Sequence, residues 1–202
     1  VLFRSYWVLP PTGTWQPPAA LCEFLAAGPP PVLITFGSIL GGRDPNRMTG
    51  VLVAALQHSG QRGLIYRGWG DLGNIPLPPT ILAIESVPHA WLLPQVAAVV
   101  HHGGAGVTAA TVLAQRPAVV VPVFGDQQLW AVRLQELGLA PAPIPRRRLT
   151  AARLAAAIAQ AIGDARLATN LQGMAPRLQS EDGVGRAVTW LHTHWQYQPE
   201  NI

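Results

Sequence analysis

The residues with the clearest chemical potential lie in the stretch HHGGAG at residues 101–106. An apolar run precedes this stretch at residues 97–100, and a segment of small residues with helical character follows it. Glycine lets the backbone turn sharply and approach a ligand, and the first turn of a helix presents unpaired N–H groups at its positive end. The order of strand, glycine-rich turn and helix therefore predicts a site for a diphosphate.

Both features of this stretch also have a purely structural interpretation. Many turns between a strand and a helix need glycine only to pack, and a lone histidine is often a core residue. Adjacent residues of a strand point to opposite faces, so His101 and His102 are not expected to bind one metal ion together. His102 stands directly before the glycines and is the better candidate for ligand contact.

A second polar group, Gly125-Asp126-Gln127, follows the apolar run at residues 118–123. If that run is a strand of the same sheet, Asp126 and Gln127 lie at the edge where open parallel sheets bind ligands. Asp126 is also well placed to be the N-cap of a helix at residues 127–137. One carboxylate can serve both purposes, so the two interpretations stay open.

Strand and helix patterns alternate along the chain. We expect strands at residues 32–36, 63–66, 81–84, 97–100 and 118–121, and an edge strand at 139–144, where prolines are tolerated. Helical patterns cover residues 19–27, 47–58, 105–115, 127–137, 150–162, 165–179 and 185–193, with Asp44 and Thr150 as N-caps. The helix at 150–162 carries an apolar face of Leu154, Ile158, Ala161 and Ile162. This alternation predicts an α/β fold, a Rossmann-like doubly wound parallel sheet of about six strands.

Composition narrows the class of protein. The 202 residues are 49% hydrophobic and 12% charged, which is typical of a compact folded domain. The apolar runs are strand-sized, and the N-terminus has no long apolar stretch, so we expect neither a membrane span nor a signal peptide. Cys22 is the only cysteine, which excludes an internal disulfide and a cysteine metal cluster and suits the cytoplasm.

The net charge of +4 comes from arginine, since the chain has no lysine. The densest basic run, at residues 146–148, lacks the interleaved aromatics of a nucleic-acid surface, so we expect no nucleic-acid partner. A solvated loop, or a rim facing a membrane surface, is the better interpretation.

Four stretches together resemble a known family: ITFGS at 34–38, RGWGDL at 67–72, VPHAWLLPQVAAVVHHGGAG at 87–106 and PVFGDQQLWA at 122–131. Their order and spacing resemble the donor-binding half of nucleotide-sugar-dependent glycosyltransferases of the two-domain GT-B type, family 1. The branch that resembles the chain most contains the sterol glucosyltransferases and the enzymes that glycosylate antibiotics. The resemblance covers roughly residues 31–162.

The resemblance implies a role for each matching residue. It also implies a reaction that needs no cofactor and no metal ion. Three departures from the family pattern stand out: Val107 replaces a threonine, Ser86 lies near the place of a base-stacking tryptophan in plant enzymes, and Gln128 replaces a proline. The implied diphosphate contacts are Ser38, His102, Gly103, Gly104, Ala105, Gly106, Val107 and Thr108, the nucleobase contacts Trp69, Val87 and His89, and the sugar contacts Asp126 and Gln127.

The resemblance also implies a domain organisation. Residues 1–30 would be a tail and interdomain linker, 31–179 the donor-binding domain, and 180–202 a C-terminal helix and tail. The N-terminal acceptor domain of the family, which carries the histidine general base, is absent from these residues. We therefore expect no catalytic residue in this chain and little transfer by the chain alone.

The implied reaction moves a hexosyl group, with glucosyl expected, from a UDP- or dTDP-sugar to a hydroxyl of a lipid, sterol or natural product, with inversion. The hydrophobic acceptor would be bound by the N-terminal domain, and peripheral contact with a membrane would fit such an acceptor. Two alternatives stay open: a lipid-linked N-acetylglucosamine transferase, and a non-catalytic nucleotide-sugar-binding module.

Overall fold

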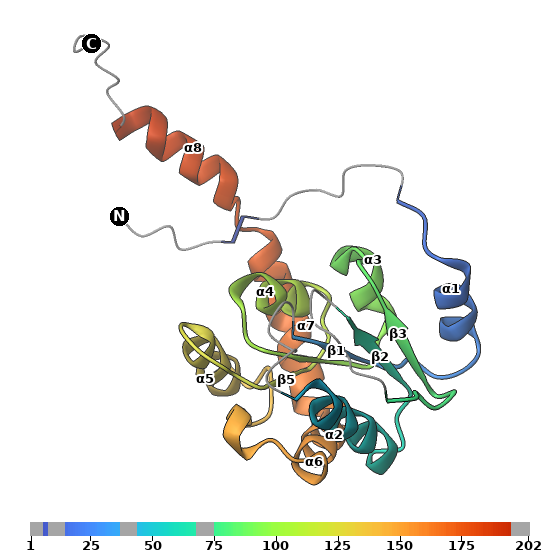
Figure 1. Ribbon diagram of the computed structural model, residues 1–202. Coiled ribbons are helices and arrows are strands. Elements are labelled where there is room, and N and C mark those ends of the chain that lie inside the picture. The colour runs from blue at the N-terminus through green and yellow to red at the C-terminus, as the bar shows by residue number, and fades with distance from the viewer. Residues whose placement is uncertain (1–5, 8–14, 37–43, 68–74, 195–202) are drawn as a thin grey trace, which may run out of the picture.

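A parallel five-stranded sheet forms the centre of the computed structural model, which describes residues 6–7, 15–36, 44–67 and 75–194 (Figure 1). The strand order is β3-β2-β1-β4-β5. The sheet grows from β1 to β3 on one side and from β4 to β5 on the other, so the order in which strands are added reverses between β1 and β4. In doubly wound sheets a crevice opens at such a reversal, beyond the carboxyl ends of the strands. The strands are β1 Val32–Thr35, β2 Gly63–Tyr66, β3 Ile81–Ile84, β4 Ala98–His101 and β5 Ala118–Val120.

The central strands are buried on both faces. Every residue of β1 and of β4 is buried, and the two strands pair from Val32 opposite Ala98 to Thr35 opposite His101. Burial on both faces explains why these strands are continuous apolar runs instead of alternating patterns. The register brings the ends of β1 and β4 to the same level of the sheet.

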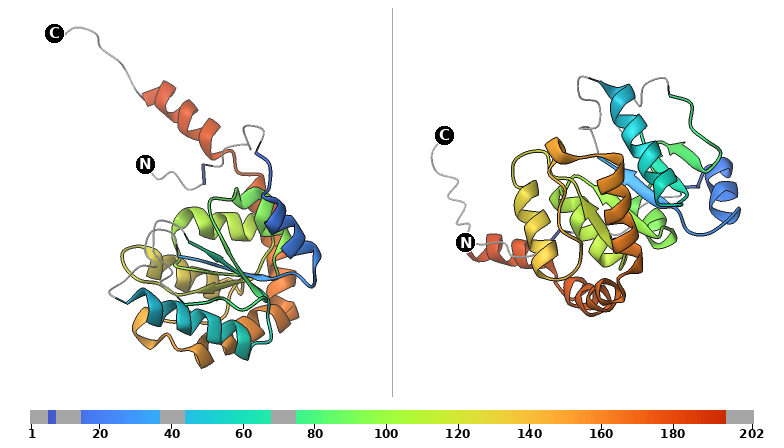
Figure 2. Two further views of the ribbon diagram at one scale, coloured as in Figure 1. Left: turned by 45° about the vertical axis from the view of Figure 1, so that its right-hand side comes forward. Right: turned by 90° about the horizontal axis from the view of Figure 1, so that it is seen from below.

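One face of the sheet is covered by α2 Pro45–His58 and α6 Ala151–Gly163, which pack against each other (Figure 2). Both helices begin at the predicted caps. Asp44 Oδ1 accepts a hydrogen bond of 2.9 Å from the Arg47 amide, and Thr150 Oγ1 accepts one of 3.3 Å from the Arg153 amide. Their apolar sides meet Ile34, Val100 and neighbouring strand residues in one core.

Helices α1 Ala19–Ala26, α3 His89–Leu92 and α4 Ala105–Leu113 cover the opposite face. Helices α5 Gln127–Glu136 and α7 Ala165–Gln179 extend this layer around α4 and β5. The described part of the chain also contains two 3₁₀ turns, η2 Leu93–Gln95 and η3 Arg146–Arg148.

The last helix, α8 Gly183–His194, projects away from the layered body (Figure 1). Gly183 and Ala187 are its buried residues, whereas Val184, Val188 and Leu191 are exposed. Trp190 stacks on His194 with their ring centroids 4.6 Å apart, and Trp195 lies outside the described residues. No helix in the described ranges has both the length and the apolar character needed to cross a bilayer.

Two details of the predicted fold are wrong. Residues 139–144 do not form a sixth strand, because Pro141 and Pro143 have no N–H to donate to a ladder; the Ile144 amide makes a single bond of 2.9 Å to Val120 O. Ile162 does not belong to the buried face of α6, where Leu154, Ile158 and Ala161 are buried.

The buried face of α6 yields a matched test. Ile158→Ala should lower the free energy of unfolding by about 2–5 kcal/mol, because the fully buried side chain would leave a cavity beside the sheet. Ile162→Ala, one turn later, removes a side chain that is 38% exposed and should cost less than about 1 kcal/mol. Urea denaturation of both variants checks this, and equal losses would contradict the packing of α6.

Candidate functional site

The glycine-rich turn after β4 lies in the crevice where the strand order reverses. Gly103 has a φ of +88°, and a Cβ there would stand 2.9 Å from Gln127 O. At Gly104 a Cβ would stand 2.5 Å from His102 Nε2. Glycine is needed at these two positions because the turn passes close to α5 and because the His102 ring lies over Gly104.

Helix α4 begins immediately after this turn with no side-chain cap, its N-cap being Gly104. Its first intrahelical acceptor, Gly104 O, receives the Thr108 amide at 3.0 Å. The amides of Ala105, Gly106 and Val107 come before that bond and therefore have no acceptor within the helix. Their positive dipole end suits an anion such as the predicted diphosphate.

Val107 and Thr108 turn their side chains inward. Both residues are buried, and the Thr108 hydroxyl has no hydrogen-bond partner among the described residues. Contact with a phosphate through this hydroxyl would therefore require access to a buried atom, and the Thr108 amide already donates to Gly104 O at 3.0 Å. The diphosphate role of Thr108 stays a prediction.

His101 is a core residue. It is fully buried, and its Nδ1 accepts a hydrogen bond of 3.0 Å from the Gly103 amide. Burial, assisted by the neighbouring His102 and His89, lowers the pKa of His101 to about 3. The neutral ring therefore holds the start of the glycine-rich turn, which is a structural role in agreement with the core interpretation.

His102 is half-buried and faces the crevice over Gly104. Its Nδ1 is buried, and its Nε2 is the ring nitrogen that lies beside Gly104. Burial lowers the pKa of His102, while the Thr35 backbone and the Asp126 carboxylate act in the opposite direction. The ring therefore presents Nε2 to the glycine-rich turn, and the diphosphate contact of His102 stays a prediction.

The Asp126 side chain does not cap helix α5. Helix α5 has no side-chain cap, and Asp126 Oδ2 instead accepts a hydrogen bond of 3.0 Å from Trp130 Nε1. The Tyr6 ring packs on Trp130, with centroids 5.6 Å apart. Burial first, then Glu181 and Asp126, raises the pKa of Tyr6 to about 12. The N-cap prediction is therefore wrong for the Asp126 side chain, which accepts from Trp130 of α5 instead of from the first amides of that helix.

Gln127 is buried, and its side chain organises the loop before α5. Its Oε1 accepts hydrogen bonds from the amides of Val123 at 2.8 Å and Phe124 at 3.2 Å. The oxygen that could accept from a sugar hydroxyl is thus already engaged by the protein. The sugar-binding roles of Asp126 and Gln127 stay predictions.

The predicted nucleobase residues fall at the end of β3. Val87 is buried in the core beside α3, and its edge-on contact with a base stays a prediction. His89 is the first residue of α3, and burial lowers its pKa. Ser38 and Trp69 lie outside the described residues.

The structure brings His102, the start of α4 and Asp126 to one edge of the sheet. Within the described ranges no three histidine, cysteine, aspartate or glutamate side chains gather in a way that could hold a metal ion. Sequence reasoning missed Trp130 and Tyr6 as partners of this site. The four-residue spacing of Asp126 and Trp130 on a helix was a usable signal for the first, but nothing in the sequence indicated the second.

Comparison with known proteins finds similarity over most of the chain. Residues 68–183 match the family model "Erythromycin biosynthesis protein CIII-like, C-terminal domain". The chain is 42% identical over 189 residues to the sterol 3-beta-glucosyltransferase UGT80A2 of Arabidopsis thaliana, an alignment that covers 93% of this chain and 29% of that protein. It is 35% identical over 209 residues to the sterol 3-beta-glucosyltransferase of Neosartorya fischeri, covering 98% of this chain and 14% of that protein.

Two solved structures have a fold that superimposes on most of this chain. The glycotransferase of kitacinnamycin superimposes with a TM-score of 0.73 at 28% identity, over 94% of this chain and 47% of that one. The calicheamicin glycosyltransferase CalG4 superimposes with a TM-score of 0.69 at 25% identity, over 89% of this chain and 43% of that one. The chain thus spans less than half the length of each of these proteins.

The buried imidazole of His101 predicts a pH dependence of stability. The unfolded chain takes up a proton at His101 near pH 6.5, whereas the folded chain does so only near pH 3. The free energy of unfolding should therefore fall as the pH drops through this window, by up to about 1.4 kcal/mol per pH unit from this group. Urea denaturation between about pH 7 and pH 5 measures this slope.

His101→Asn is the matched variant, because its side-chain oxygen can still accept from the Gly103 amide but does not titrate. The variant should lose less stability than the wild type over the same pH interval. An unchanged slope in His101→Asn would mean that other groups cause the pH dependence.

Proposed function

The chain belongs to the family of EryCIII-like C-terminal domains, which are family 1 GT-B glycosyltransferase domains, and on this premise we propose that it binds a nucleotide-sugar donor for glycosyl transfer. The observation that carries the proposal is the arrangement of His102 beside the uncapped start of α4. An imidazole and several backbone amides directed at one point form a site for a diphosphate that needs no lysine or metal ion.

The proposed reaction is the transfer of a hexosyl group, with glucosyl expected, from a UDP- or dTDP-sugar. The acceptor oxygen attacks the anomeric carbon with inversion, the bond from that carbon to the diphosphate oxygen breaks, and the acceptor proton passes to a general base. Charge develops on the departing diphosphate, where His102 and the α4 amides would stabilise it. Asp126 would orient the sugar through its hydroxyl groups.

We propose a sterol or a related lipid hydroxyl as the acceptor, because the similar Arabidopsis and Neosartorya proteins are named sterol 3-beta-glucosyltransferases. The chain spans 29% of the Arabidopsis relative, so the acceptor site and the general base are proposed to lie in a separate N-terminal domain. Metal-independent transfer and a cytoplasmic location belong to the same proposal.

Donor binding can be tested by calorimetric titration of the chain with UDP-glucose and dTDP-glucose. His102→Ala should weaken binding of the preferred donor by about tenfold or more, because a hydrogen bond to a charged group is worth about 1.5–3 kcal/mol. Binding should also take up a proton, since the diphosphate raises the depressed pKa of His102. Affinity should therefore rise as the pH falls from about 8 to 6.

His58→Ala is the matched control, because His58 is an exposed histidine at the end of α2, away from the crevice. It should retain both the affinity and the proton uptake of the wild type. Titration in buffers of different ionisation enthalpy measures the uptake. Undiminished donor binding by His102→Ala would overturn the assignment of the diphosphate site.

The contact between Trp130 and Asp126 gives a separate prediction about the sugar. Trp130→Phe keeps a ring against Tyr6 but removes the N–H that holds the Asp126 carboxylate. The affinity for UDP-glucose should fall by a few fold, about the value of one hydrogen bond, whereas the affinity for UDP should not change. Parallel calorimetric titrations with the two ligands measure the difference.

Leu129→Ala serves as the control for this variant, since Leu129 is the adjacent residue of α5 and is 67% exposed. It should leave both affinities at the wild-type level. Equal weakening of UDP and UDP-glucose by Trp130→Phe would show that Trp130 supports the fold of the crevice and not the sugar contact.

A further inference from the structure

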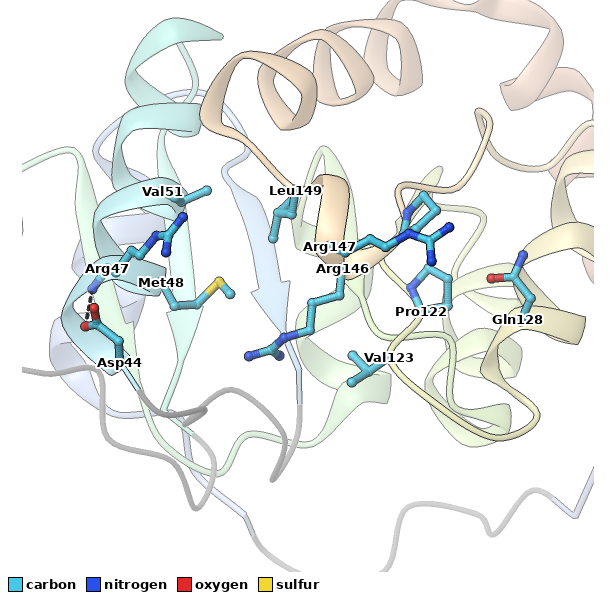
Figure 3. Close-up of a pocket in the computed structure, with 11 residues that line it drawn as sticks. Asp44, Arg47, Met48, Val51, Pro122, Val123, Gln128, Arg146, Arg147 and Leu149 are labelled. Carbon is cyan, nitrogen blue, oxygen red and sulfur yellow. Dashed lines mark hydrogen bonds between the residues drawn. The ribbon is translucent and has the colours of Figure 1, made fainter.

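A second polar hollow, of about 920 Å³, lies between the start of α2, the segment after β5 and the η3 turn (Figure 3). None of the described residues assigned to the donor diphosphate, base or sugar lines it. Its border with the sugar loop is formed by Val123 and Gln128, on either side of Gln127 along the chain. The hollow is therefore a separate site that adjoins the donor crevice.

Arginine residues from distant parts of the sequence line this hollow. Arg47 comes from the first turn of α2, and Arg146 and Arg147 come from η3. Figure 3 shows Arg146 directed between Met48 and Val123, and Arg147 directed toward Gln128. The tertiary fold thus concentrates positive charge that the sequence shows only as a basic run and one separate arginine.

The positive charge of the hollow is only partly balanced. Asp44 is the single carboxylate among its described lining residues, and its Oδ1 accepts from the Arg47 amide as the cap of α2. Arg47 and Arg147 form no ion pair with the part of the chain that the structure describes. Arg47 and Arg147 against Asp44 leave an excess of positive charge in the lining, which favours an anion.

The η3 turn holds its arginines in a defined place. The Arg148 amide donates to Pro145 O at 2.7 Å, and the Leu149 amide donates to Arg146 O at 3.1 Å. The turn is tied to the sheet through the Ile144 amide and to α6 through the Thr150 cap. The basic run is therefore an ordered turn at the surface, and exposed Arg147 and Arg148 agree with the predicted solvated loop.

We propose that this hollow binds the phosphate group of a phosphate ester. The guanidinium group stays charged and matches phosphate oxygens with two parallel N–H groups, which makes arginine suited to this ligand. Met48, Val51 and Leu149 supply an apolar wall for the organic part of the ester. A soluble phosphorylated metabolite and the headgroup of an anionic lipid share this chemistry.

The test compares two variants of the whole chain. Arg47→Gln/Arg147→Gln removes two charges from the hollow, whereas Arg148→Gln removes one from the same turn but outside the lining. The probes are glycerol 3-phosphate in calorimetric titration, and phosphatidylcholine vesicles with and without phosphatidic acid in flotation. Thermal unfolding of both variants checks that these exposed substitutions leave the fold intact.

The double variant should weaken binding of at least one probe by about tenfold, and Arg148→Gln should stay close to the wild type. Loss for glycerol 3-phosphate assigns a soluble ester, and loss for phosphatidic acid vesicles alone assigns a lipid headgroup. An equal loss in Arg148→Gln, or no binding of either probe by the wild type, would overturn the proposal.

The donor site is separated from this proposal by two further measurements. His102→Ala should keep binding the phosphate ester, and the double arginine variant should keep binding UDP-glucose. Loss of the ester in His102→Ala, with retention in the arginine variant, would place the anion in the glycine-rich turn and overturn the second site. Failure of UDP-glucose to bind would count against the proposed function and not against the hollow.

Discussion

The parallel pairing of β1 with β4 is the constraint on which the rest of this domain depends. The two strands are buried along their whole length and stay in register from Val32 opposite Ala98 to Thr35 opposite His101. Because strand order reverses across this pair, the segment after β4 enters an open crevice instead of a packed layer. The helix layers on both faces bury the pair and exclude water from it. This burial lowers the pKa values of His101 and His102 at the end of β4.

Burial at the end of β4 gives two adjacent histidines different roles. His101 points into the layer beside α4, where its neutral ring accepts from the Gly103 amide and holds the turn. His102 is half-buried beside Gly104, where burial lowers its pKa while the Thr35 backbone and the Asp126 carboxylate act in the opposite direction. The alternation of side chains along a strand is thus sufficient to make one residue structural and to offer the next to a ligand.

The loop between β5 and α5 forms the wall between the proposed donor site and the arginine-lined hollow. On one side Gln127 O lies against Gly103 of the glycine-rich turn, and on the other Val123 and Gln128 border the arginine hollow. The Gln127 side chain makes this wall rigid by accepting from two amides of its own loop. In the two proposals, neutral backbone donors would bind the anion at the glycine-rich turn, whereas permanently charged guanidinium groups would bind it in the hollow.

The sequence by itself determined the order of elements, most of their bounds, the caps Asp44 and Thr150, and the place of the glycine-rich turn, because these depend on local periodicity and on backbone chemistry. Residues 139–144 were predicted as an edge strand that tolerates proline, but they lie outside the sheet. The reason is that Pro141 and Pro143 have no N–H for a hydrogen bond to a neighbouring strand. Only the tertiary structure decided that Trp130 donates to Asp126 and packs against Tyr6, and that Gln127 is committed to its own loop. It also decided that Arg47 lines the same hollow as Arg146 and Arg147. These contacts join residues that are distant in the sequence or have several available partners, and the choice between partners depends on the packed geometry of the whole domain.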